Sequence, residues 1–276
     1  MPLVTTAELV ADAQARQAAV VAFNVITLEH AQGILAGAER AGRPVILQLS
    51  QNAVTYHGSP TAIAAAITAA ARESGADASL HLDHITDVDL LQRAAALGAS
   101  SAMYDGAHLP FTENVAQTRA MVEWGAAHGV WIEAELGEIG GKDGAHAPGV
   151  RTDPSEARRF VDDTGVAALA VAVGSSHAMT EQTAALDRAL IRSLAAVVPV
   201  PLVLHGSSGV PDEELRRAVA SGMVKINVGT ALNVAFTGAV RSALDANPAL
   251  TDPRKYSAPA RTAVAVAVEH VLNVLA

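Results

Sequence analysis

Short apolar runs alternate with longer amphipathic segments along almost the whole chain. The runs are rich in Val, Ile, Leu and Ala, and polar, Gly or Pro residues bound them. Strands that are buried on both faces of a parallel sheet have this almost wholly apolar character. We therefore predict eight strands, at residues 20–24, 44–48, 78–83, 101–104, 130–135, 168–173, 201–205 and 224–227.

Between these runs, apolar positions recur with the 3.6-residue period of a helix. Several of the segments open with residues that favour a helix start, such as Asp153 followed by Pro154. We predict helices at 27–41, 61–74, 88–97, 112–128, 154–164, 186–197, 211–220 and 232–245, with one further helix before the set at 5–17 and one after it at 259–275.

Eight successive strand–helix units without a break in composition favour an α/β fold of the (β/α)8 TIM-barrel type over an open doubly wound sheet. We expect one domain, residues 1–276, with an extra helix at each end. The one long irregular insertion, 136–152, contains five glycines and follows the fifth strand. We expect it to form a lid over the active site, with a plain surface loop as the alternative.

The composition limits the kinds of metal site and of partner that we expect for this chain. The chain has no cysteine, so any metal must be held by nitrogen and oxygen atoms. The net charge of −9 and the absence of a clustered basic patch argue against nucleic acid and membranes as partners. No apolar run approaches the ~20 residues of a membrane span, and the first residues do not resemble a signal peptide, so we expect a cytoplasmic location.

Three histidines follow predicted strands: His84, His177 and His205. The carboxyl ends of barrel strands meet at one mouth, so these imidazoles should converge. Three imidazoles leave a tetrahedral Zn²⁺ one open position, which is the arrangement of a catalytic site; cobalt or iron would also bind. Three of the other histidines, His30, His128 and His270, fall on predicted helices, where we expect them to be exposed.

Small-residue turns follow the predicted strands at the same mouth. They lie at residues 174–176, 206–209 and 227–230, and two of them lead into predicted helices. Backbone amides and hydroxyl groups in such turns bind phosphate oxygens, and the loops after the last strands of (β/α)8 barrels are frequent phosphate sites.

Specific strings occur in order at these strand ends: HLDH at 81–84, MYDG at 103–106, EAELG at 133–137, LAVAVG at 169–174, LHGSSG at 204–209 and KINV at 225–228. Together they resemble the class II, metal-dependent ketose-bisphosphate aldolases, which include fructose- and tagatose-bisphosphate enzymes. The resemblance implies zinc-dependent, reversible cleavage of a ketose 1,6-bisphosphate to dihydroxyacetone phosphate and glyceraldehyde 3-phosphate. Among these substrates we expect fructose 1,6-bisphosphate, which would place the enzyme in glycolysis.

The resemblance also assigns roles to residues. His84, His177 and His205 match the zinc ligands, and Asp83 matches the acid that exchanges a proton with the substrate hydroxyl. The acidic positions that can host a second, divalent or monovalent cation correspond to Asp105 and Glu135.

For the phosphorylated substrate, the resemblance implies binding by glycine, serine, asparagine and threonine residues of the mouth. These are Asn24, Ser50, Gly174, Gly206, Ser208, Asn227 and Thr230. Arg254 resembles an arginine that reaches the far phosphate, often from a neighbouring subunit, so we expect a homodimer or homotetramer.

The lid departs from the family pattern. Where a glutamate-rich segment usually follows the glycine pair, this chain has Lys142 and Asp143. Asp143 stands at the position of the base that moves the carbon-bound proton, and Glu138 is an alternative.

Four other functions stay open at this point. The enzyme could act on tagatose bisphosphate or join dihydroxyacetone phosphate to another aldehyde. Lys225, on the eighth predicted strand, could form an imine in a Schiff-base aldolase. The histidines could serve a zinc hydrolase, or the chain could be a non-catalytic phospho-sugar-binding paralogue.

Overall fold

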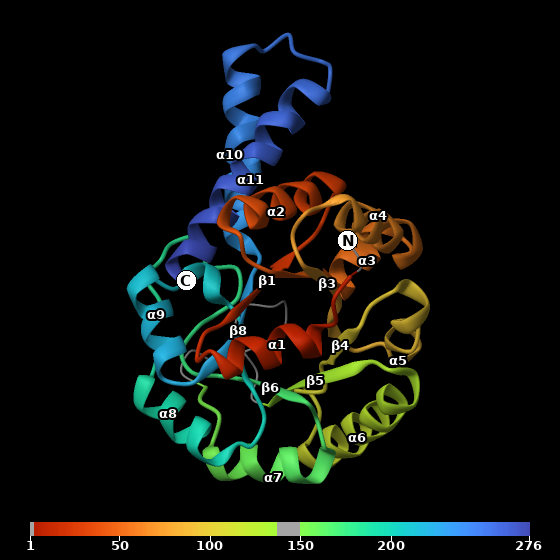
Figure 1. Cartoon of the computed structure of the whole chain (residues 1–276), viewed down its shortest axis with the longest axis vertical. Helices are drawn as coiled ribbons and strands as arrows, with labels where there is room; N and C mark the ends of the chain where they lie inside the picture. The colour runs from red at the N-terminus through yellow and green to blue at the C-terminus, as the bar shows by residue number, and fades with distance from the viewer. Residues whose placement is uncertain (1–2, 137–149) are drawn as a thin grey trace.

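The computed structural model describes residues 3–136 and 150–276 and shows a closed barrel of parallel strands in chain order (Figure 1). The ring closes where β1 pairs with β8. The predicted (β/α)8 barrel is therefore confirmed. Its strands are β1 (Val20–Asn24), β2 (Val45–Ser50), β3 (Ala78–Ile85), β4 (Ser101–Tyr104), β5 (Trp131–Leu136), β6 (Ala168–Val171), β7 (Leu202–Leu204) and β8 (Met223–Val228).

Helices surround the barrel (Figure 1). Several of them begin with a side chain that caps the helix. The carboxylate of Asp153, for example, accepts hydrogen bonds from the backbone N–H groups of Ser155 and Glu156. The helices that follow successive strands are α2 (Leu28–Ala41), α4 (Pro60–Glu73), α5 (Val88–Leu91), α6 (Phe111–His128), α7 (Pro154–Thr164), α8 (Arg188–Val197), α9 (Asp212–Ala220) and α10 (Thr230–Ala246).

The structure differs from the prediction at several helix boundaries. A short helix that the pattern did not predict, α3 (Gln51–His57), directly follows β2. The helix after β3 is one turn of α-helix, followed by a 3-10 helix, η1 (Ala95–Leu97); a second 3-10 helix, η2 (Ser207–Gly209), follows β7. The last helix, α11 (Arg254–Val274), begins before the predicted start and continues through Pro259.

The N-terminal end of the barrel is covered by α1 (Thr6–Ala15) (Figure 1). Leu9 and Val10 of this helix pack with Ile46 and Val224 from the strands in one buried cluster. The hydroxyl of Thr6 lies 2.9 Å from that of Ser79 at the start of β3. The open mouth is therefore at the carboxyl ends of the strands.

The last two helices, α10 and α11, form a pair that projects beyond the barrel (Figure 1). Leu232 is the single buried residue of α10, whereas Val234 is 49% exposed and Val266 of α11 is 55% exposed. His30 is buried, contrary to the prediction, because its ring stacks on Phe236 of α10 at 4.7 Å. None of the described helices combines the length and apolar character needed to cross a membrane.

Candidate active site

The first feature of the mouth is an irregularity in β3. The strand runs to Ile85, past its predicted end at Asp83, and its register with β4 shifts between Leu82 and Ile85. His84, inside this bulge, has a φ of 51°. Few residues other than glycine have a positive φ, and those that do cluster at functional sites. The bulge places the imidazole of His84 at the mouth, beside the carboxylate of Asp83.

The three predicted histidines converge. The ring centroids are 4.6 Å apart for His84 and His205, 5.1 Å for His84 and His177, and 5.8 Å for His177 and His205. One ring nitrogen from each lies within 4.8 Å of the other two, a grouping that could hold a metal ion. A second grouping with the same property joins His84 to Asp105 and Glu135.

The donor atoms fit a divalent metal. Nδ1 of His84 lies 2.8 Å from Oδ2 of Asp105, so this nitrogen donates its proton to the carboxylate and Nε2 carries the lone pair. Nε2 of His84 faces Nδ1 of His205 at 3.0 Å. Burial lowers the pKa of His205 to about 4, which keeps its imidazole neutral and able to bind a metal at neutral pH.

Asp83 is the carboxylate that directly precedes His84 in the chain. It is 1% exposed, and Oδ1 has no hydrogen bond to any described residue. Its two oxygens lie 4.0 Å from Nε2 of His81 and 4.0 Å from Nε2 of His84. Burial raises the pKa of Asp83, but His84, His205 and His81 lower it more, so it stays below its ordinary value and the group is ionised.

The predicted small-residue turns also lie together. Gly206 has a φ of 65°, and a Cβ there would lie 2.6 Å from the carbonyl group of Ser176, so this turn requires glycine. The hydroxyl of Ser208 accepts a hydrogen bond of 3.0 Å from the N–H of Ala231, which ties this turn to the first residues of α10, Thr230 among them. The turn after β7 and the start of α10 therefore lie side by side at the mouth.

Gly174 lies at the adjoining turn, with a φ of 119°. Nη2 of Arg151 lies 3.2 Å from the point where a Cβ of Gly174 would be. Arg151 is thus a cationic side chain beside these turns that the sequence analysis did not single out. An arginine just before a helix start has no local signal that distinguishes it from an exposed surface residue.

The remaining predicted substrate residues of the barrel lie at strand ends. Asn24, at the end of β1, accepts a hydrogen bond from Gln48 at 2.9 Å. Ser50, at the end of β2, pairs in register with Asp83 and caps α3. Nδ2 of Asn227, on β8, lies 3.0 Å from Nε2 of His205.

Among the predicted site residues that the structure describes, Arg254 lies away from this group. Arg254 begins α11 in the projecting helix pair, where its side chain is 89% exposed and pairs with Asp252 at 2.9 Å. Asp143 and its alternative Glu138 lie outside the described residues.

Lys225 does not have the surroundings of an imine-forming lysine. Its Nζ lies 2.8 Å from Oε2 of Glu133, and both side chains are fully buried. An imine-forming lysine must bring its amine to the substrate carbonyl, whereas this Nζ is buried and held by a carboxylate. The contact therefore counts against the Schiff-base alternative.

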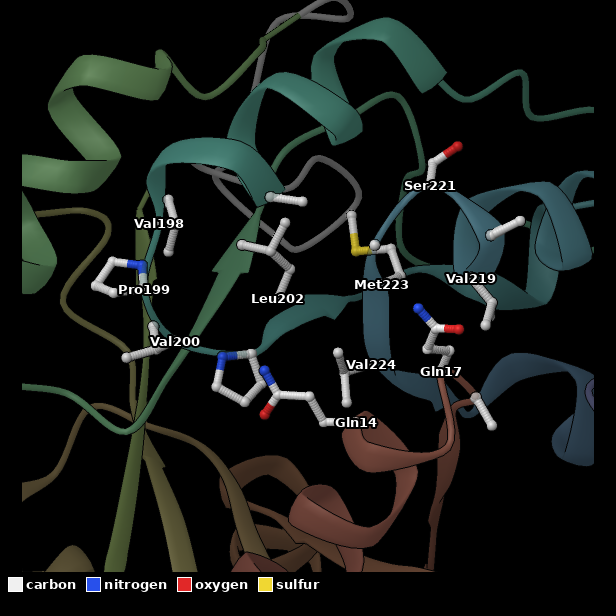
Figure 2. A pocket seen from close by; sticks show the side chains of 15 residues that line it. Gln14, Gln17, Val198, Pro199, Val200, Leu202, Val219, Ser221, Met223 and Val224 are labelled. Carbon is white, nitrogen blue, oxygen red and sulfur yellow. The ribbon is translucent and has the colours of Figure 1, made fainter.

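A cavity of about 600 Å³ lies at the opposite end of the barrel (Figure 2). It is bounded by Gln14 in the last turn of α1, by Gln17 just after this helix, and by the segments that precede β7 and β8. None of the side chains that line it is ionisable at neutral pH. It offers no group for acid–base or metal chemistry, so we place the active site at the mouth.

This fold and this mouth define a barrel enzyme with a site suited to a divalent metal. The sequence profile of the family described as "Fructose-bisphosphate aldolase class-II" matches residues 4–276. The chain therefore belongs to this family, and it is an aldolase, a carbon–carbon lyase that cleaves a ketose bisphosphate.

Solved structures agree with this assignment. The YdjI aldolase from Escherichia coli K12 is 27% identical, with a TM-score of 0.83 over 99% of this chain and 97% of that one. A candidate fructose-1,6-bisphosphate aldolase from Coccidioides immitis is 28% identical, with a TM-score of 0.86 over 98% and 95% of the two chains. The fructose-bisphosphate aldolase from Campylobacter jejuni, at 22% identity, shares the fold, with a TM-score of 0.84 over 99% and 95%.

Proposed function

We propose that this protein is a zinc-dependent aldolase that reversibly cleaves fructose 1,6-bisphosphate to dihydroxyacetone phosphate and glyceraldehyde 3-phosphate. The convergence of His84, His177 and His205 beside Asp83 carries the proposal. These three histidines would hold the zinc ion, and Asp105 and Glu135 would serve a second cation. Bound zinc would act as a Lewis acid on the ketone and hydroxyl oxygens of the substrate.

Asp83 supplies the proton transfer at the substrate hydroxyl. In cleavage, its ionised carboxylate takes the proton from the C4 hydroxyl, so that C4 becomes an aldehyde carbon and the C3–C4 bond breaks. The electron pair of that bond stays with the ketone half. A proton then reaches C3 to give dihydroxyacetone phosphate, and we assign this transfer to Asp143, with Glu138 as the alternative. Condensation follows the same steps in reverse.

The small-residue turns bind the substrate. The backbone around Gly174, Gly206 and Ser208 and the start of α10 at Thr230 offer neutral donors for one phosphate group. Asn24, Ser50 and Asn227 lie at strand ends of the same barrel mouth, where their polar groups would meet the sugar hydroxyls. These donors suit the phosphate end that fructose and tagatose bisphosphates share, so tagatose bisphosphate is the second substrate to test.

A substitution at the metal site tests the proposal. His205→Ala should abolish zinc binding and cleavage together, because it removes one of three ligands. His128→Ala, which changes an exposed histidine of α6, should keep both. Metal content and triose phosphate release are measured on the same preparations. Full activity of His205→Ala would refute the proposed zinc site.

One alternative of another class follows from the lid sequence. A chain with Lys142 and Asp143 in place of a glutamate-rich segment could bind a phosphorylated sugar without cleaving it. Binding of zinc and dihydroxyacetone phosphate, with no turnover of either bisphosphate, would favour this phospho-sugar-binding function over the enzyme.

A further inference from the structure

An ion pair lies inside the barrel, next to the histidines but outside the proposed chemistry. Lys225 of β8 places Nζ 2.8 Å from Oε2 of Glu133 on β5, and neither side chain is exposed to solvent. Burying two charges is costly unless their contacts are close and the remaining polar atoms are satisfied. A hydrophobic pair would fill the same space without that cost, so the ion pair calls for a specific role.

The second oxygen of Glu133 contacts one of the three histidines. Oε1 lies 3.1 Å from Nε2 of His205, so one carboxylate oxygen faces the lysine and the other faces the imidazole. An ionised carboxylate has no proton to donate and acts only as an acceptor. Nε2 of His205 therefore carries a proton and donates it to Glu133.

This proton position decides which nitrogen of His205 has the lone pair. In a neutral imidazole with Nε2 protonated, the lone pair is on Nδ1, the atom that lies 3.0 Å from Nε2 of His84. His84 has the opposite tautomer, since Asp105 accepts the proton of its Nδ1. Asp105 and Glu133 thus orient the two rings so that the nitrogen lone pairs of His84 and His205 point toward each other. Two facing lone pairs repel each other, but a cation between them is bound by both.

The amide of Asn227 fits this proton position only when it is rotated, because as placed its Nδ2 faces Nε2 of His205 as a donor. Its amide lies against His205, with Nδ2 3.0 Å from Nε2, while Oδ1 is buried without a hydrogen bond among the described residues. Rotating the amide group by 180° fills the same space and places its oxygen opposite the Nε2 proton. Nε2 of His205 then donates to Glu133, with Oδ1 of Asn227 as a second acceptor.

We propose that Glu133 is the positioning residue of His205 and that Lys225 is the counter-charge that keeps Glu133 in this role. The carboxylate selects the tautomer and the ring orientation that present Nδ1 to the metal, as outer-shell carboxylates do for histidine ligands in general. The inference rests on the proposed function, because it takes the three histidines as a metal site. It also gives the buried lysine a role that does not involve an imine.

Zinc affinity of the full-length protein tests this role, measured at constant pH by competition with a chromogenic chelator. The double variant Glu133→Leu/Lys225→Met replaces the ion pair with apolar side chains and leaves no unpaired buried charge. We expect it to fold and to bind Zn²⁺ on the order of 10–100-fold more weakly, because the Nε2 proton of His205 loses its carboxylate acceptor.

The variant Glu133→Gln/Lys225→Met restores a neutral acceptor at the same place. We expect it to recover part of the lost affinity. Ser101→Ala is the control: Ser101 is fully buried in the same barrel and contacts His81 and Thr6 but none of the three histidines, so zinc binding should not change.

Wild-type zinc affinity in the Leu/Met variant would overturn the inference, because the ion pair would then serve folding alone. Equal affinity of the Leu/Met and Gln/Met variants would also overturn it, because the acceptor at position 133 would then have no effect. Wild-type protein that binds zinc but cleaves no bisphosphate would count against the proposed function alone, and the order of zinc affinities would still decide this inference.

Discussion

Asp83 carries a negative charge although it is almost completely buried. Burial raises the pKa of its carboxyl group, but the histidines His84, His205 and His81 around it lower the pKa further than burial raises it. We propose that this carboxylate exchanges a proton with a substrate hydroxyl and does not itself bind the metal ion. Proton transfer and metal binding at this mouth should therefore be separable by substitution.

Asp83→Asn tests this separation. The amide keeps the size of the side chain but cannot accept a proton, so we expect kcat to fall by a factor on the order of 10²–10⁴. Zinc affinity should change little. Steady-state kinetics and a zinc titration on the same protein measure the two effects. Loss of zinc binding together with turnover would assign Asp83 to metal binding instead.

For single residues, the sequence predicted the contacts at strand ends better than the contacts inside the barrel. His84, His177 and His205 are polar groups at the ends of apolar runs, and strand ends meet at one mouth in any parallel barrel. The contact between Glu133 and Lys225 was not predicted, because it joins β5 to β8 across the interior. It depends on the stagger of the strands, which a local pattern does not encode.

The projecting helices α10 and α11 are the element that the barrel itself does not explain. Most of α10 is not buried, and Val234 and Val266 are about half exposed. Arg254 begins α11 after the turn between the two helices and contacts Asp252. We propose that the pair packs against a second copy of the chain, in a homodimer or homotetramer, and presents Arg254 to the substrate of a neighbour.

Arg254→Ala should raise KM for the bisphosphate, because the far phosphate loses a cation, while the oligomeric state stays the same. Light scattering gives the molecular mass and steady-state assays give KM. Lys255→Ala removes the neighbouring charge and serves as the control. A monomeric protein, or an Arg254→Ala variant with wild-type KM, would contradict this proposal.

The strands and most helices were predictable from the sequence, because the spacing of apolar residues and the capping residues depend only on neighbouring positions in the chain. The exceptions have tertiary causes. Helix α11 continues through Pro259, where proline normally marks a helix start, because its buried face packs against the barrel helices. Gly33 and Gly37 of α2 allow this close approach: a Cβ at either would lie within 2.8 Å of a backbone oxygen of α11. The pattern alone does not reveal such a helix contact.

At the scale of the whole molecule, the barrel keeps neutral imidazoles in its interior. Burial lowers the pKa of His81 to about 3, and the charge of Lys225 lowers it as well. Burial also lowers the pKa of His205 to about 4. Both groups take up protons more readily in the unfolded chain, where the ordinary value of 6.5 applies. Acid should therefore favour unfolding of the metal-free protein.

Between about pH 6.5 and the folded pKa, the unfolded chain binds more protons than the folded protein, so the free energy of unfolding falls as the pH falls. From pH 7 to pH 5 we expect each of these histidines to contribute a loss on the order of 1–2 kcal/mol. Urea unfolding of metal-free protein at both pH values measures it. His81→Gln should show a smaller loss than wild type; an equal loss would contradict the assigned neutral state of His81.

The most direct test of the proposed activity is the release of triose phosphate from fructose 1,6-bisphosphate, with tagatose bisphosphate assayed in parallel. The protein is assayed as purified, after removal of metal with a chelator, and after zinc is restored. We predict dihydroxyacetone phosphate formation that is lost on chelation and recovered with zinc. Cleavage that persists after complete metal removal, or zinc-loaded protein that releases no triose phosphate from either sugar, would contradict the proposed zinc-dependent activity.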